Sequence, residues 1–183
     1  METNMSRHLI KTSLPTPVGD ITLLIDGDTI LICEFSDHGD RVVRQIERFY
    51  KDDHIVDDDC PQQILEVVQA YFGGDRDALN TLKTDPLGTP FERSVWKALR
   101  EIPAGTTDSY GALAKRLGSS PRAVGRANGR NPVGLVHPCH RIIGADGSLT
   151  GYAGGLDRKE WLLKHEGAIL NLQPSARPQS IEQ

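Results

Sequence analysis

The sequence predicts an α+β fold in two parts, a small sheet with helices followed by a helical domain of the helix-turn-helix type. Three observations predict it. Strand-like runs open the chain, and Asp26-Gly27 between the second and third is a strong hairpin signal. Two amphipathic helical patterns follow them. Further along, two short helical patterns are separated by the tight turn Gly118-Ser119, as in a helix-turn-helix.

The first domain is expected over residues 1–72. Its strand segments are rich in Ile, Leu, Thr and Val, and turn residues separate them. One helix starts near Pro61 and stops at Gly73-Gly74. The acidic run 57–59 is interpreted as a loop. The predicted elements are strands over 8–14, 18–25 and 29–35 and helices over 40–51 and 61–72.

Residues 73–88 are polar, contain Gly and Pro, and are predicted to be a linker. A second domain follows over 89–170, and residues 171–183 are predicted to be a disordered tail. Thr89 and Glu92 form a capping-box pattern around Pro90, and Asp157 with Glu160 forms another. The predicted helices cover 89–102, 109–117, 120–128 and 157–166.

Charge divides the chain unevenly. Residues 1–88 hold 8 Lys and Arg against 17 Asp and Glu, whereas residues 89–168 hold 12 against 7. The second half is therefore basic within an acidic chain and suits a polyanion. An ordinary solvated surface is the alternative that charge alone leaves open.

The three cysteines, Cys33, Cys60 and Cys139, are odd in number and far apart. This argues against a disulfide framework and for a reducing compartment. Their spacing does not match a structural zinc site, so no metal and no cofactor are expected. The sequence has no apolar stretch long enough to indicate a membrane span or a secretory signal. This favours a cytoplasmic location.

The second helix of the helix-turn-helix carries Arg122 and Arg126, with Arg130 four residues further on. These arginines share one face if the helix continues. Arg122 lies in the first turn, where the helix dipole and free N–H groups favour phosphate. The two interpretations are a DNA-binding face and a solvated arginine face.

Pro138-Cys139-His140-Arg141 is the candidate chemical centre, because a thiol beside basic residues is a candidate nucleophile. His140, His137 and His165 are candidate bases, and Glu166 is a candidate for the acid that orients a base. The alternatives are a buried structural thiol and a metal site, which lacks a clear fourth ligand.

These residues belong to a series of motifs that resembles the O6-alkylguanine-DNA alkyltransferases. The resemblance runs from about Thr89 to Gly167, and the first half is similar to the family's first, ribonuclease-H-like domain. It implies a winged helix-turn-helix in the second domain. The motifs are Arg122-Ala123-Val124-Gly125, Asn131-Pro132, Pro138-Cys139-His140-Arg141, Gly151-Tyr152-Ala153-Gly154-Gly155, Lys159-Glu160-Trp161-Leu162-Leu163 and His165-Glu166-Gly167.

The resemblance implies DNA repair by direct reversal. A monomeric protein binds double-stranded DNA through the minor groove and flips O6-alkylguanine, or O4-alkylthymine, into a pocket. The alkyl group moves irreversibly to a cysteine, once per protein. The implied residues are the acceptor Cys139, the base His140, the orienting acid Glu166, Tyr110 and the hinge Asn131; the DNA-contacting Arg122, Arg126, Arg130, Tyr110, Ala123 and Gly125; and the pocket residues Gly134, Val136, Ile142, Tyr152, Ala153 and Gly154.

The chain departs from the family pattern at two positions. His137 stands where an apolar residue is usual, and Gly134 stands where some members carry proline, which predicts a wider pocket. Three rival functions remain: a protein that binds alkylated DNA without chemistry, a Cys-His hydrolase, and an alkylation sensor that regulates transcription. Stoichiometric transfer, capped at one product per protein, distinguishes the alkyltransferase from the hydrolase.

Overall fold

The hairpin predicted at Asp26-Gly27 forms the centre of a five-stranded sheet in the computed structural model, which describes residues 5–168. The strand order is β4-β1-β2-β3-β5. The three central strands are antiparallel, and each edge strand runs parallel to its neighbour. The strands are β1 (His8–Leu14), β2 (Ile21–Asp26), β3 (Thr29–Phe35), β4 (His54–Asp57) and β5 (Lys83–Thr84).

Three details of this half differ from the sequence prediction. The second strand starts at Ile21, not at residue 18, because Gly19 (φ 111°) closes a turn onto Thr16. The acidic run 57–59, predicted to be a loop, begins within a strand, because β4 ends at Asp57. The predicted linker contributes β5 and the short helix η2 (Ala78–Thr81). Both edge strands are short and largely solvent-facing, so they lack the alternation that identifies a strand.

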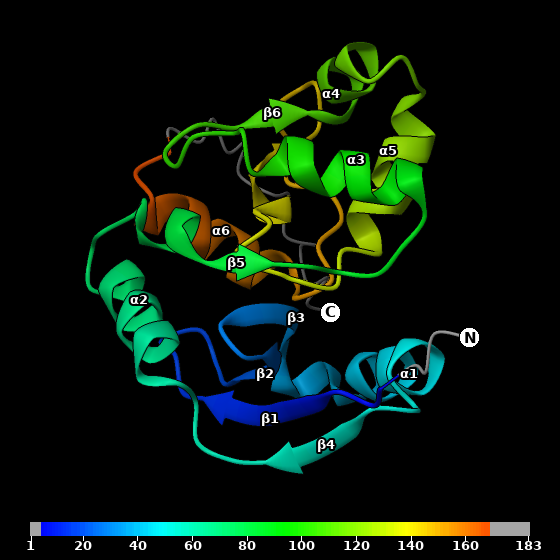
Figure 1. Cartoon of the computed structure of the whole chain (residues 1–183). Coiled ribbons are helices and arrows are strands. Elements are labelled where there is room, and N and C mark those ends of the chain that lie inside the picture. The colour runs from blue at the N-terminus through cyan, green and yellow to red at the C-terminus, as the bar shows by residue number, and fades with distance from the viewer. Residues whose placement is uncertain (1–4, 169–183) are drawn as a thin grey trace, which may run out of the picture.

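Both faces of the sheet are buried. Helix α1 (Gly39–Phe49) covers one face, where Val42 packs with Leu24 and Leu31. Helix α2 (Gln62–Phe72) and part of the second domain cover the other face, where Ile64 packs with Leu23. Figure 1 shows the sheet domain in blue and cyan below the helical domain in green to orange, with β5 running between them.

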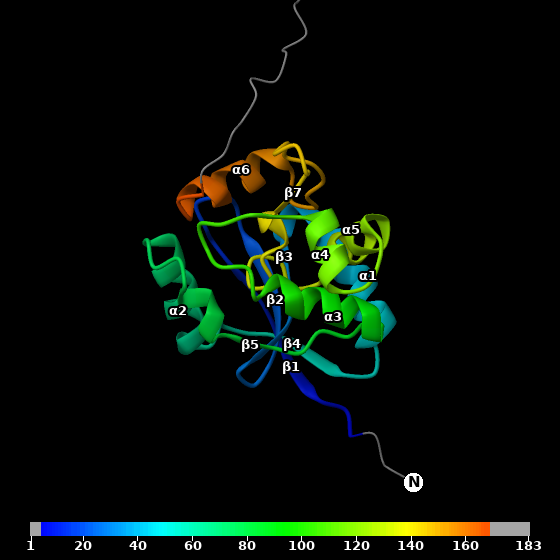
Figure 2. The ribbon, with the colours of Figure 1, turned by 90° about the horizontal axis from the view of Figure 1, so that it is seen from above.

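The second domain is built on the predicted helices. The capping box at Thr89 is confirmed, since Glu92 N–H donates to Thr89 Oγ1 at 3.1 Å and Thr89 N–H donates to Glu92 Oε2 at 3.2 Å. Figure 2 shows α3, α4 and α5 gathered on the side away from α2. The elements are α3 (Pro90–Leu99), β6 (Asp108–Ser109), α4 (Tyr110–Arg116), α5 (Pro121–Gly129), the short helix η3 (Cys139–Arg141), β7 (Ile142–Ile143) and α6 (Leu156–His165).

The capping box predicted at Asp157 is wrong. Helix α6 starts at Leu156, and its N-cap is Gly155 at a φ of 95°, a conformation that suits glycine. Asp157 therefore lies within the first turn and makes no capping bond. Glu166 follows the helix as its C-cap. The predicted tail, 171–183, lies outside the described residues, as do residues 169 and 170 of the predicted second domain.

Within the described part of the chain, no helix has both the length and the apolar character needed to cross a membrane.

Candidate active site and DNA-binding face

The segment 131–141, here called the thiol turn, joins α5 to the candidate nucleophile and is fixed to the sheet domain. Cys33 N–H donates to the Pro132 carbonyl at 2.9 Å, and Gly134 N–H donates to the Cys33 carbonyl at 2.8 Å. A Cβ at Gly134 would lie 3.3 Å from that carbonyl oxygen. The next residue, Leu135, has a φ of 67°, which is strained for a side chain of its size. The sheet thus determines the path of the turn.

Cys139 opens onto a cavity of about 380 Å³ between the two domains. Seven other predicted site residues line it with Cys139, whereas Val136 and Ile142 do not, because their side chains are buried in the cores on either side. The sheet domain also contributes to the wall, which sequence reasoning missed. The predicted residues on the wall besides Cys139 are Tyr110, Gly125, Asn131, Gly134, Tyr152, Ala153 and Gly154; the sheet domain adds Ile21, Cys33, Glu34, Phe35 and Arg41.

Cys139 is buried, and its pKa is raised above the ordinary value. Burial is the main cause, and it exceeds the opposing effect of a side-chain hydrogen bond with Asn131. Glu34 raises the pKa further, while Lys159 and Arg41 lower it. The sulfur is therefore a protonated thiol at neutral pH and needs a base to become a nucleophile. Within residues 5–168, no three His, Cys, Asp or Glu side chains gather as they would around a metal ion.

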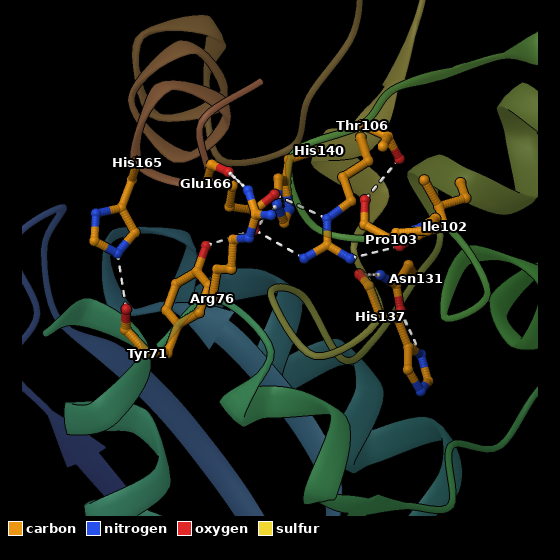
Figure 3. A network of polar contacts seen from close by, with 11 residues as sticks. Tyr71, Arg76, Ile102, Pro103, Thr106, Asn131, His137, His140, His165 and Glu166 are labelled. Carbon is orange, nitrogen blue, oxygen red and sulfur yellow. Dashed lines mark hydrogen bonds and ion pairs between the residues drawn. The ribbon is translucent and has the colours of Figure 1, made fainter. Parts of the chain in front are cut away.

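His140 is placed to be that base. It is fully buried, and its Nε2 lies 2.9 Å from Glu166 Oε2 (Figure 3). Burial lowers the pKa of His140 more than Glu166 raises it, so the ring is neutral. Because the carboxylate only accepts, Nε2 carries the proton. The other ring nitrogen, Nδ1, has no protein hydrogen-bond partner among the described residues and is free to accept a proton.

Besides His140, three donor groups hold Glu166 as a carboxylate. Arg141 donates through Nε to Oε1 at 2.8 Å and through Nη2 to Oε2 at 2.9 Å. The Tyr71 hydroxyl donates to Oε2 at 2.7 Å. Burial alone would raise the pKa of Glu166, but His140 and Arg141 together lower it well below its usual value. Tyr71 lies on α2 and had no sequence signal, since only tertiary packing brings it here.

The other two candidate histidines have different partners. His137 is buried, with Nδ1 3.1 Å from Asn131 Oδ1 and Nε2 2.8 Å from Thr84 Oγ1. His165 Nε2 donates to the Tyr71 carbonyl at 2.8 Å (Figure 3). Of the three, His140 is therefore the histidine that pairs with a buried carboxylate.

Helix α6 also fixes the loop that closes the cavity. Lys159 lies two helical turns before Glu166 and is fully buried. Its Nζ donates to the carbonyls of Ile142 and, at 2.8 Å, Thr150. Burial lowers the pKa of Lys159 to about 8. The Tyr110 hydroxyl donates to the same Thr150 carbonyl at 3.2 Å, which joins α4 to this loop at the wall of the cavity.

Helix α5 presents a cationic face beside the cavity. Arg122 and Arg126 are exposed and make no ion pair with any residue in the described chain. Ser120 caps the helix by accepting from Ala123 N–H at 3.1 Å. The helix ends at Gly129, so Arg130 does not extend the predicted row; its Nη1 lies 3.2 Å from Glu92 Oε1. The cationic face therefore consists of two arginines, with Ala123 and Gly125 between them.

Comparison with known proteins matches both halves of the chain to domains of one family. Residues 9–86 match the ribonuclease-like domain of the 6-O-methylguanine DNA methyltransferases, and residues 90–168 match their DNA-binding domain. The methylated-DNA–protein-cysteine methyltransferase of Shigella flexneri is 41% identical over 89% of this chain and 98% of its own length. The chain belongs to this family. The Methanosarcina acetivorans enzyme of the same name is 42% identical over 84% of this chain and 95% of its own.

Solved structures of the family have the same fold. The O6-methylguanine methyltransferase of Mycobacterium tuberculosis superposes with a TM-score of 0.70, at 34% identity, over 87% of this chain and 93% of its own. The M. tuberculosis protein in complex with DNA also gives a TM-score of 0.70, at 36% identity, over 86% of this chain and 92% of its own. The predicted fold class and family resemblance are both confirmed.

Proposed function

We propose that this DNA-repair methyltransferase moves the alkyl group of O6-alkylguanine, or of O4-alkylthymine, in double-stranded DNA onto Sγ of Cys139. The observation that carries the proposal is the buried thiol at an interdomain cavity, beside a neutral histidine held by a carboxylate. A buried thiol with a raised pKa is inert without a base, and His140 supplies one.

The reaction proceeds as an in-line displacement. His140 Nδ1 takes the thiol proton through an intervening water molecule, and Glu166 stabilises the imidazolium that forms. Sγ bonds to the alkyl carbon as the bond from that carbon to O6 breaks. The leaving purine takes the electron pair of that bond and a proton from Tyr110, on the cavity wall, and the proton held by His140 passes through water to restore the Tyr110 hydroxyl. The thioether on Cys139 is a poor leaving group, so each molecule reacts once.

DNA binding follows from α5 and the burial of the thiol. Cys139 is only 7% exposed, so a base stacked in the duplex does not reach it and must be flipped out. A monomer lays α5 in the minor groove, with Arg122 filling the gap in the stack and Arg126 contacting the backbone. The M. tuberculosis relative was solved in complex with DNA, which supports DNA binding by this chain. Arg122→Ala is expected to slow transfer from duplex DNA far more than transfer from free O6-methylguanine.

The absence of a proline at Gly134 favours a broad range of adducts. Its N–H donates to the Cys33 carbonyl, a bond that proline in this place cannot make, and Gly134 lines the cavity without a side chain. We expect O6-benzylguanine to react at a rate close to that of the methyl adduct. Three unpaired cysteines are consistent with action in the reducing cytoplasm.

Intact-mass spectrometry tests the proposal. The protein is mixed with an excess of duplex carrying one O6-methylguanine, beside Cys139→Ala and the matched control Cys60→Ala, which changes a thiol outside the cavity. We expect one added methyl group per chain, mapped to Cys139, in the wild type and in Cys60→Ala. A repaired duplex without protein methylation, or continuing turnover, would contradict the proposal.

A further inference from the structure

His137 is a buried polar residue in the thiol turn that the chemical step does not use. It is 3% exposed, lies two residues before Cys139, and both of its ring nitrogens have partners. A buried histidine costs free energy unless its polar atoms are satisfied, so its partners indicate its role.

The hydrogen bonds around His137 define a single tautomer. Asn131 Oδ1 accepts from Val133 N–H at 3.1 Å, which identifies that atom as oxygen and requires His137 Nδ1 to donate to it. At the other end, Arg100 Nη1 donates to Thr84 Oγ1 at 3.3 Å, while the Thr84 hydroxyl donates to His137 Nε2. The ring is thus neutral, with its proton on Nδ1.

These bonds fix the amide of Asn131. With Oδ1 accepting two hydrogen bonds, the amide cannot rotate, and Nδ2 donates to the His137 carbonyl at 3.0 Å. The same carbonyl accepts from Cys139 N–H at 2.7 Å. Asn131 therefore faces the backbone of the thiol turn beside His137 (Figure 3), and Cys139, two residues further on, begins the short helix η3.

The chain of contacts also crosses the domain interface. Thr84 belongs to β5 and is paired with Ile30 of β3 in the sheet. The charged groups around the outer end of the His137 ring are Asp85, Arg93, Lys97 and Arg100, which line a hollow beside it. Burial, and then Arg100, lower the pKa of His137 to about 3, so the ring stays neutral across the working pH range.

We propose that His137 is a positioning residue: through Nδ1 it holds the Asn131 amide against the Cys139 thiol, and through Nε2 it anchors that amide to the sheet domain. This inference rests on the proposed role of Cys139 as the alkyl acceptor. The inference gives a specific role to His137, which stands where an apolar residue is usual in the family.

Three variants distinguish the contribution of Nδ1 from that of Nε2. His137→Asn places an amide nitrogen near the position of Nδ1 and keeps the bond to Asn131. His137→Gln reaches the position of Nε2 and keeps the bond to Thr84. His137→Phe removes both. The readouts are the single-turnover rate of methyl transfer and the pH midpoint of Cys139 modification by iodoacetamide, followed by peptide mapping.

We expect His137→Asn to transfer methyl within about threefold of the wild-type rate, whereas His137→Gln and His137→Phe are about tenfold slower, as for one lost neutral hydrogen bond. The pH midpoint of Cys139 modification should rise only in His137→Gln and His137→Phe. In an Asn131→Ala background, His137→Phe should no longer move the midpoint, because His137 acts through that amide.

Equal effects of all three substitutions, slow transfer with an unmoved Cys139 midpoint, or an undiminished effect in the Asn131→Ala background would each overturn the inference and leave His137 a packing residue. Failure of the proposed function is distinguishable: the wild type would then leave Cys139 unmethylated, while the iodoacetamide titration would still report on His137.

Discussion

Two buried histidines flank Cys139, and they differ in what holds them. His140 contacts Glu166, which Arg141 and Tyr71 keep in its charged form. The ring nitrogens of His137 are hydrogen-bonded to the neutral groups Asn131 and Thr84. We call these the charged support and the neutral support of the thiol.

This difference in partners determines which of the two histidines can accept a proton. A proton on His140 is stabilised by the carboxylate beside it, whereas a proton on His137 would lie in a buried site next to Arg100. Two histidines three positions apart in one turn thus have opposite chemistry, and their partners decide it. Each support includes one residue of the sheet domain: Tyr71 belongs to the charged support and Thr84 to the neutral support.

The largest effect is expected from breaking the charged support. Glu166→Gln leaves the Arg141 guanidinium buried without its carboxylate, which should lower the free energy of unfolding by about 3–5 kcal/mol. Urea denaturation at pH 7 measures it. Glu160→Gln, on the helix α6 that Glu166 follows, is the matched control, since its pair with Lys164 is partly exposed and its loss should change stability by less than about 1 kcal/mol. Equal losses would refute the distinction.

A subtler comparison removes one hydroxyl from each support. Tyr71→Phe deletes a donor to a carboxylate and should cost about 1.5–3 kcal/mol of unfolding free energy. Thr84→Val deletes a donor to a neutral ring and should cost about 0.5–1.5 kcal/mol. The same denaturation experiment ranks the two, and a greater loss from Thr84→Val would contradict the charged-versus-neutral account.

The last comparison concerns the pH dependence of stability. Because the folded pKa of His137 is about 3, the unfolded chain binds a proton below about pH 6.5 that the folded chain does not. The stability that its neutral form supplies is therefore present above pH 6.5 and lost as the pH falls. His137→Asn should lose stability less steeply between pH 6 and pH 4, by up to about 1.4 kcal/mol per pH unit. Parallel curves for the two proteins would contradict the placement of His137.

Much of this arrangement was predictable from sequence, for physical reasons. The hairpin at Asp26-Gly27 and the cap at Thr89 have local signals, and both are confirmed. The edge strands β4 and β5 were missed because backbone pairing with a neighbour defines them, not side-chain alternation. The helix predicted to start at Asp157 begins one residue earlier, since Gly155 sets its start without a side-chain cap.

The candidate site likewise contains residues that a local sequence pattern predicted and residues that it did not. Cys139, His140 and Glu166 came from motifs near the end of the chain, and the structure brings His140 and Glu166 into contact beside the cavity that Cys139 lines. Tyr71 and Thr84 come from the sheet domain, 95 and 53 residues from their partners, and no local pattern marks such distant contacts. Their roles could be seen only once the two domains were packed together.

The most direct test is the pH dependence of single-turnover methyl transfer by the wild type and by His140→Asn, with His54→Asn, at an exposed position on β4, as the matched control. We predict that the control follows the wild-type profile, while His140→Asn is slower by at least about 100-fold, as for a lost general base. Its rate should rise with pH toward the pKa of the unaided Cys139 thiol. A wild-type rate and profile in His140→Asn would contradict the claim that the charged support activates the thiol.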